Sequence, residues 1–148
     1  MTNPAPETKQ KRLGAARHGG RILLGSFLTF AGVSHLTVAR EEFQAQVPDF
    51  VPLDRDLVVL LSGIAEIGLG MSLLLLLKKR VHIGWIVAAF FVAVFPGNIA
   101  QWLHARDGFG LDSDAARVTR LFFQPILIAW ALWSTAAWRD RKALRKQG

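Results

Sequence analysis

Residues 57–77 read LVVLLSGIAEIGLGMSLLLLL, a stretch in which Glu66 is the only charged side chain. At about 1.5 Å per residue, a helix of this length crosses a hydrocarbon core roughly 30 Å thick. A helix is expected because it satisfies its own backbone hydrogen bonds, which lipid cannot do. This stretch therefore predicts a transmembrane helix.

Three further apolar stretches of similar length predict three more spans. They are residues 22–38 (ILLGSFLTFAGVSHLTV), 81–103 (VHIGWIVAAFFVAVFPGNIAQWL) and 121–138 (LFFQPILIAWALWSTAAW). Of the 148 residues, 51% are hydrophobic and 20% are charged, so a soluble fold would have too little polar surface to cover four such helices. We expect an all-α, four-helix transmembrane bundle over residues 21–138. Basic tails flank it at 1–20, which we expect to be unstructured, and at 139–148.

Basic residues gather on one side of this predicted membrane domain. Residues 1–21, 78–80 and 139–148 together carry 13 Lys and Arg, whereas the opposite connections carry 5, beside eight acidic residues. Because positively charged loops stay in the cytoplasm, both termini are predicted to be cytoplasmic. The net charge of +7 therefore reflects orientation in a bilayer, and we expect no nucleic-acid partner. A cleavable signal peptide is the alternative for the first span, since residues 37–39 have the small-residue spacing of a cleavage site.

The connections carry their own local signals. Residues 39–56 alternate apolar and acidic side chains and are interrupted by prolines, which predicts a short interfacial helix and a turn over the mouth of the bundle. Asp112 or Ser113 is the expected N-cap of the fourth span. In the third span Pro96 removes one helical hydrogen bond, which predicts a kink.

Six polar side chains interrupt the apolar spans toward their expected outer ends. An ionisable group in hydrocarbon costs at least about 2.5–3.5 kcal/mol, so each needs a partner or a purpose. Because alternate spans run in opposite directions, the helical rise brings all six into one layer, roughly 4–14 Å below the outer boundary. The layer predicts a narrow polar cavity with Glu66 at its floor. The predicted ligand-binding residues are His35, Ser62, Glu66, Asn98, Gln101 and Gln124.

Small residues recur at helical spacing beside these polar groups. Gly25 and Gly32 share one face of the first span, while in the second span Gly70 lies on the stripe of Glu66 and Gly63 flanks it. Small residues let helix backbones approach closely in lipid. The pattern predicts a helix–helix seam next to the polar layer.

A carboxyl group near a histidine can exchange a proton with a bound molecule, and side-chain amides can hold a carbonyl oxygen. The layer therefore favours a quinone or a similar small amphiphile; the cofactor is otherwise unknown. A metal site of His35, Glu66 and His104 is an alternative, although the spacing matches no known signature. Each residue also has a structural interpretation, as a group that sets helix register or forms interhelical hydrogen bonds. With no cysteine in the chain, thiolate catalysis and Cys-ligated metal centres are excluded.

Several of these segments together resemble the DoxX-like family of small four-helix bacterial membrane proteins. The resemblance is carried by Arg21 with Leu24-Gly25, Ala31-Gly32-Val33-Ser34-His35, Phe43 with Val47-Pro48, Ser62-Gly63-Ile64-Ala65-Glu66, and Phe95-Pro96-Gly97-Asn98-Ile99. It covers most of residues 21–103, whereas the fourth span matches by placement only. This chain departs from the family at Gly97, where the familiar motif has alanine.

The resemblance implies a redox-associated membrane subunit in a bacterial cell membrane, since the family takes its name from a thiosulfate:quinone oxidoreductase subunit. It implies a redox enzyme as a protein partner, and a second copy of the chain is the other partner expected. The absence of cysteine argues against a direct part in thiol chemistry. The alternative function is a non-enzymatic scaffold or chaperone that anchors partner proteins. A small carrier is less favoured because no inverted repeat is visible.

Overall fold

The computed structural model describes residues 13–105 and 113–146, and in these residues the regular structure is entirely helical. Its five α-helices are α1 (Ala15–Leu36), α2 (Arg40–Gln44), α3 (Arg55–Leu75), α4 (Arg80–Leu103) and α5 (Asp114–Ser134). Two short 3-10 helices, η1 (Leu77–Lys79) and η2 (Arg141–Lys146), follow α3 and α5. The predicted unstructured tail lies outside the described residues over positions 1–12, as does the predicted cap Asp112.

Each predicted span corresponds to one long helix, but two of the helices begin well before the apolar stretch. Residues 15–20, which were expected to belong to the unstructured tail, form the first turns of α1. α5 begins seven residues ahead of the predicted span because the Ser113 side chain caps it, accepting a hydrogen bond from the Ala116 N–H at 3.2 Å. The prediction of Ser113 as the N-cap is therefore confirmed.

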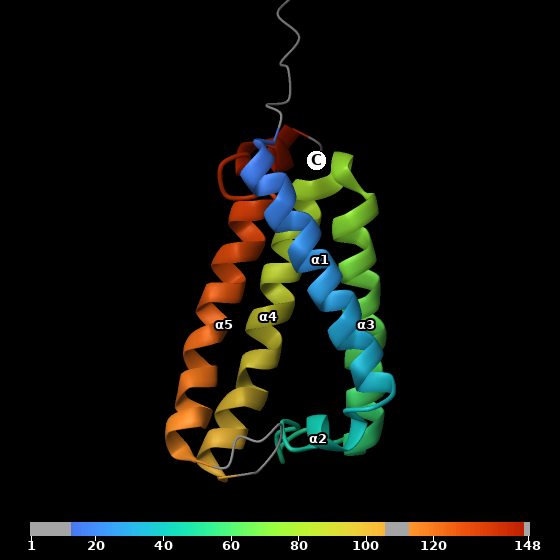
Figure 1. The fold of residues 1–148 in the computed structure, drawn as a ribbon, viewed down its shortest axis with the longest axis vertical. Helices are drawn as coiled ribbons and strands as arrows, with labels where there is room; N and C mark the ends of the chain where they lie inside the picture. Colours follow the sequence, from blue (N-terminus) through green and yellow to red (C-terminus); the bar gives the residue numbers. More distant parts are fainter. Residues whose placement is uncertain (1–12, 106–112, 147–148) are drawn as a thin grey trace, which may run out of the picture.

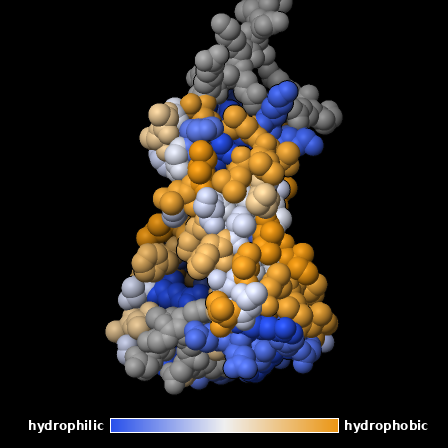
Figure 2. Space-filling view, turned by 45° about the vertical axis from the view of Figure 1, so that its right-hand side comes forward, coloured by the Kyte–Doolittle hydropathy of each residue, from blue (hydrophilic) through white to orange (hydrophobic). Residues whose placement is uncertain are grey.

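Three of the helices in the described residues are long and apolar enough to cross a membrane, namely Arg55–Leu75, Leu77–Leu103 and Asp114–Ser134. The helix α1 has 22 residues but is less apolar, because it contains Arg21 and His35. Both of these side chains lie on its buried face. Many large hydrophobic side chains point outward; Phe30 is 71% exposed and Phe122 is 69% exposed. Figure 2 shows hydrophobic groups around the middle of the molecule and hydrophilic groups toward its ends. These features indicate a multi-pass membrane protein.

The long helices are arranged as two pairs, α1 with α3 and α4 with α5, which converge at one end and separate toward the other (Figure 1). Glycines form the seam of the first pair. An added Cβ on Gly32 would lie 2.6 Å from the Gly63 carbonyl oxygen, and one on Gly70 would lie 2.7 Å from that of Gly25. The two backbones are therefore in contact at two points seven residues apart, and the predicted seam is confirmed.

The hydrophobic core lies where the two pairs converge. It joins Leu24 and Leu28 of α1 to Leu73 of α3, and both to a surface of α4 and α5 that includes Val87 and Ala131. All five side chains are at most 2% exposed. At this end the Trp130 indole also donates a hydrogen bond to the Gly20 carbonyl oxygen at 3.0 Å, which ties α5 to α1. The core thus holds the pairs together at one end only.

The same end is closed by a turn that follows α5. The helix stops at Ser134, four residues before the end of the predicted span, because Ala136 has a φ of 52° that an α-helix cannot accommodate. Arg80, which is 4% exposed, donates to the Thr135 carbonyl oxygen and to the Asp140 carboxylate, each at 2.7 Å. The turn is thereby fastened to the first residue of α4.

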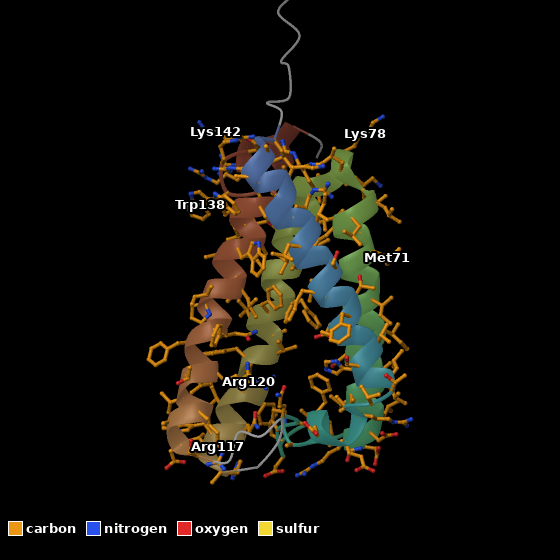
Figure 3. All side chains as sticks on the ribbon, viewed as in Figure 1. Met71, Lys78, Arg117, Arg120, Trp138 and Lys142 are labelled. Atoms are coloured by element: carbon orange, nitrogen blue, oxygen red, sulfur yellow. The ribbon has the colours of Figure 1, made fainter. Side chains whose placement is uncertain are left out.

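Charged residues separate between the two ends as the sequence predicts. Lys78 and Lys142 lie at the end where α1 begins, and Arg117 lies at the opposite end (Figure 3). The acidic residues of the first long connection, including Asp54 and Asp56, lie at the Arg117 end. The beginning of α1 and the C-terminal part of the chain are therefore on the same side of the helices (Figure 1).

The predicted short helix in residues 39–56 is confirmed as α2, which crosses between the two helix pairs at their separated end (Figure 1). Arg40 forms a two-pronged ion pair with Asp56, with its Nε 2.6 Å from Oδ1, so α2 is fixed to the start of α3. The helix α4 continues through Pro96 as one helix, and the predicted kink stays a prediction.

Candidate functional site

A cavity of about 410 Å³ lies in the separated half of the molecule, between the two helix pairs and above α2. All four long helices contribute side chains to it, and α2 with the loop after it contributes the rest. Its wall is mainly aromatic and aliphatic. The polar side chains in the wall are His35, Gln46, Ser62, Glu66, Asn98, Arg120 and Gln124. Five of the six predicted site residues therefore meet at one cavity.

His35 and Glu66 form the polar part of the α1–α3 wall. His35 Nδ1 lies 2.8 Å from the Ala31 carbonyl oxygen and 3.0 Å from Glu66 Oε2. Because a carbonyl oxygen only accepts, Nδ1 carries the proton and donates it to Ala31. Among the described residues, Glu66 Oε2 has no hydrogen-bond partner of its own. Oε2 is thus buried against the imidazole, while the Glu66 side chain as a whole lies in the cavity wall.

Two amides form the polar part of the α4–α5 wall. Asn98 Nδ2 donates to Gln124 Oε1 at 3.0 Å, and Gln124 Nε2 donates to the Phe91 carbonyl oxygen at 2.6 Å. Both side chains are buried, at 7% and 5% exposure. This chain of hydrogen bonds joins α4 to α5, so the two amides serve as interhelical contacts as well as cavity wall.

The other two predicted residues have different outcomes. Ser62 lies in the cavity wall one turn of α3 before Glu66. Gln101 is 1% exposed and does not line the cavity, and its role as a ligand-binding residue stays a prediction. It lies on α4 only three residues after Asn98, but the rotation over that interval is enough to take it out of the wall.

The cavity is covered at the separated end of the helix pairs by α2 and the following loop, as predicted for the mouth of the bundle. The ring of Phe43 stacks on the His35 imidazole, with centroids 3.3 Å apart and planes 14° from parallel. The Gln46 backbone packs directly against α4 at Gly97, where a Cβ would collide with the Gln46 carbonyl oxygen. Gly97, the position that departs from the DoxX-like motif, is thus the point where the loop touches α4.

Arg120 and Gln46 are the polar cavity residues that the sequence interpretation missed. The hydropathy pattern starts the fourth span at Leu121 and so assigns Arg120 to the preceding connection. In the structure it is half-buried on α5, one turn before Gln124 and in the same wall. The Gln46 amide satisfies its neighbours when its oxygen faces Arg120, which places the oxygen 3.1 Å from Nη1. The i, i+4 spacing of Arg120 and Gln124 is the signal that finds it.

The metal alternative gains no support from the geometry. In residues 13–105 and 113–146, no cluster of three His, Asp or Glu side chains is arranged to hold a metal ion. His104 does not line the cavity and instead lies 3.7 Å from Asp49. The imidazole and the carboxylate of the cavity therefore form a pair without a third ligand from this set.

A family model matches the part of the chain that contains the cavity. The family model described as "Domain of unknown function (DUF8561)" matches residues 24–135, which is most of the chain. The chain belongs to the DUF8561 family. The DUF8561 region contains every residue that lines the cavity, from Phe27 to Leu127, together with the glycine seam. No curated protein and no solved structure matches the chain.

Proposed function

We propose that this DUF8561 protein spans the membrane four times, with α1 as the span additional to the three apolar helices and with both termini in the cytoplasm. The support for α1 is its length and its antiparallel contact with α3 through the glycine seam, from Gly25 to Gly32. The support for the orientation is the excess of basic residues at the end where α1 begins. Arg21, which is buried, donates to the Leu73 and Leu74 carbonyl oxygens and so is compensated within the protein.

Orientation can be tested directly because the chain has no cysteine of its own. Single cysteines are placed at two exposed positions, Glu41→Cys on α2 and Lys142→Cys beyond α5. In intact cells, a membrane-impermeant maleimide is expected to label Glu41→Cys and to label Lys142→Cys only after lysis. The reverse pattern would invert the orientation. Labelling of both in intact cells would contradict the four-span arrangement.

We further propose that the cavity binds a quinone or a similar small amphiphile, as part of a redox-associated membrane subunit. The observation that carries this proposal is a cavity of about 410 Å³ whose wall is apolar apart from a few convergent polar groups. Sites for small organic ligands have this character and volumes of roughly 300–1,000 Å³. The location between membrane-spanning helices favours a ligand that partitions into lipid.

The polar groups on the two walls suit a ring that carries oxygens on opposite edges. On the α1–α3 wall, the Glu66 carboxylate beside His35 accepts a hydrogen bond from a hydroxyl and has an imidazole next to it for proton exchange. On the α4–α5 wall, Asn98 and Gln124 supply amide groups for a carbonyl oxygen. The aromatic side chains Phe27 and Phe91 line the space between.

The resemblance to the DoxX-like family supports the same proposal. The residues that carry it run from Arg21 to Ile99, and in the structure several of them line one cavity: Ala31, His35, Phe43, Val47, Pro48, Ser62, Glu66, Pro96, Gly97 and Asn98. Residues that match a family motif and also share a cavity are those expected to serve a common ligand. A redox enzyme as partner follows from the resemblance alone.

The ligand proposal predicts that Glu66→Gln and His35→Ala weaken binding of a short-chain ubiquinone. Loss of a hydrogen bond to a charged group removes about 1.5–3 kcal/mol, which is about a 10- to 100-fold loss of affinity. Affinity is measured by titration calorimetry on protein in nanodiscs, with empty nanodiscs subtracted. The matched controls Glu41→Gln and His82→Ala lie outside the cavity and are expected to bind as the wild type does.

Unchanged affinity in both cavity variants would contradict the ligand proposal. The Asn98–Gln124 hydrogen bond between α4 and α5 favours the second candidate, a non-enzymatic scaffold or chaperone in which the polar layer only sets helix register. On that account Glu66→Gln and His35→Ala lower the thermal unfolding midpoint in detergent, and neither the wild type nor any variant gives a binding signal.

A further inference from the structure

Two arginines at the end of the molecule where α1 begins lie over exposed indole rings. Arg17 Cζ, on α1, is 5.8 Å from the centroid of the Trp133 ring on α5. Arg141 Cζ, at the start of η2, is 4.9 Å from the centroid of the Trp138 ring. The two tryptophans are 45% and 59% exposed. Because the face of an indole attracts a cation within about 6 Å, each ring holds its guanidinium at the surface of the helices.

Neither arginine has a carboxylate partner among the described residues. Each donates a hydrogen bond from Nη1 to the backbone carbonyl oxygen of its own tryptophan, at 3.3 Å for Arg17 and 2.8 Å for Arg141. In residues 13–105 and 113–146, Asp140 is the only side-chain carboxylate at this end, and it is already paired with two other arginines. A guanidinium has five N–H donors, so both arginines keep donors for a molecule from outside the protein.

The polar and apolar groups around these pairs follow the order found at a membrane interface. Tryptophan concentrates there because its ring is apolar and its N–H is polar. Lys142 lies beyond Trp138, toward the end of the molecule (Figure 3). In the other direction, Ile126 lies seven residues before Trp133 on the same face of α5 and is 57% exposed. This order suits a phosphate beside the guanidinium and an acyl chain along the helix.

We propose that each of the two guanidinium–indole pairs binds the headgroup of an anionic phospholipid. Arg17 and Arg141 donate hydrogen bonds to the phosphate oxygens, and the indole rings pack against the first carbons of the acyl chains. A zwitterionic phospholipid has the same phosphate, but it also has a cationic group. The exposed lysines of this end, Lys78, Lys79 and Lys142, disfavour that second group. The inference depends on the membrane-spanning helices, and on neither the cavity ligand nor the orientation.

Native mass spectrometry of the full chain in a nonionic detergent tests this inference by counting bound lipids. The protein is titrated with dioleoylphosphatidylglycerol, which is anionic, or with dioleoylphosphatidylcholine, which is zwitterionic. The wild type is expected to bind two molecules of the anionic lipid about fivefold more tightly than the zwitterionic one, the factor that one basic residue contributes near a membrane surface. Arg17→Gln and Arg141→Gln are each expected to leave one such molecule, and the double variant none.

The matched control is Lys78→Gln, which removes an exposed cation from the same end. It is expected to bind both anionic lipids as the wild type does, since Lys78 has no indole contact in the structure. A loss equal to that of Arg141→Gln would indicate a general effect of charge and overturn the inference. Arg141→Gln changes only an exposed side chain, so it decides the matter even where Arg17→Gln does not fold.

Two further results would overturn the inference and leave the cavity proposal intact. The first is equal binding of the two lipids by the wild type. The second is displacement of the anionic lipid by an equal concentration of glycerophosphoglycerol, which has the same headgroup without acyl chains. That result would assign the pairs to a free phosphate ester, whereas we expect the soluble headgroup to displace no lipid.

Discussion

Gly70→Ala is expected to lower the free energy of unfolding by about 1–3 kcal/mol, although it adds only one methyl group. The added Cβ would lie 2.7 Å from the Gly25 carbonyl oxygen and 2.7 Å from the Thr29 backbone nitrogen. Because both atoms belong to the backbone of α1, no side chain can turn aside to make room. The two helices must separate, and the contact at Gly32 and Gly63 is loosened with them.

Gly68→Ala is the matched control for this prediction. It lies on the same helix two residues away, and an added Cβ there meets no atom within 4 Å. Both variants gain the same helix propensity, so their difference isolates the packing at the seam. Unfolding in a mixed detergent–denaturant titration measures it. Equal stability of the two variants would show that α1 and α3 are not in backbone contact.

Asp140→Ala is expected to destabilise the protein by about 3 kcal/mol, because it leaves Arg80 buried without its carboxylate partner. Arg80 is 4% exposed and lies 2.7 Å from Asp140, but it also donates to the Thr135 carbonyl oxygen, which favours the lower end of the range for such losses. Asp49→Ala removes an exposed ion pair with Arg55 at the other end of the molecule, and it is expected to cost less than about 1 kcal/mol.

The same carboxylate predicts a dependence on pH. Hydrogen bonds from Arg139 first, and then from Arg80, hold the pKa of Asp140 at about 2, below its ordinary value of 3.8. A lowered pKa means that the folded state favours the ionised form, so this contribution is complete above pH 3.8 and is lost as the pH falls through about 2. The difference in thermal unfolding midpoint between the wild type and Asp140→Ala is therefore expected to narrow as the pH falls across this range. A difference in midpoint that stays constant over this pH range would contradict the lowered pKa of Asp140.

The residues that sequence reasoning identified correctly are those whose signal is local. Ser113 is a cap residue directly before a helix, and Gly63 and Gly70 repeat at a spacing that keeps them on one face. The polar layer was predictable as well, because depth follows from helical rise alone, and His35 and Glu66 do meet. Depth alone does not give the direction of a side chain, so Gln101 shares the layer but does not line the cavity, and its role in binding stays a prediction.

Arg120 lines the cavity although the hydropathy pattern places it outside the spans. Its charge marked it as a loop residue, and only the early start of α5 brings it onto the helix beside Gln124. A hydropathy pattern ends a span at the first charged residue, whereas a backbone helix continues for as long as its hydrogen bonds and its cap are satisfied. The rule that located the spans therefore assigned this cavity residue to a connection.

The amino-acid sequence by itself determined that this chain forms long apolar helices, that its charges separate between two ends, and that polar groups gather in one layer. Those properties depend on composition and on the helical repeat, which are local. Only the tertiary structure decided that the helices pair as α1 with α3 and α4 with α5, that the pairs converge at one end, and that a cavity opens between them at the other. Pairing depends on which faces fit together, and contacts as close as Gly32 on Gly63 join residues far apart in the chain.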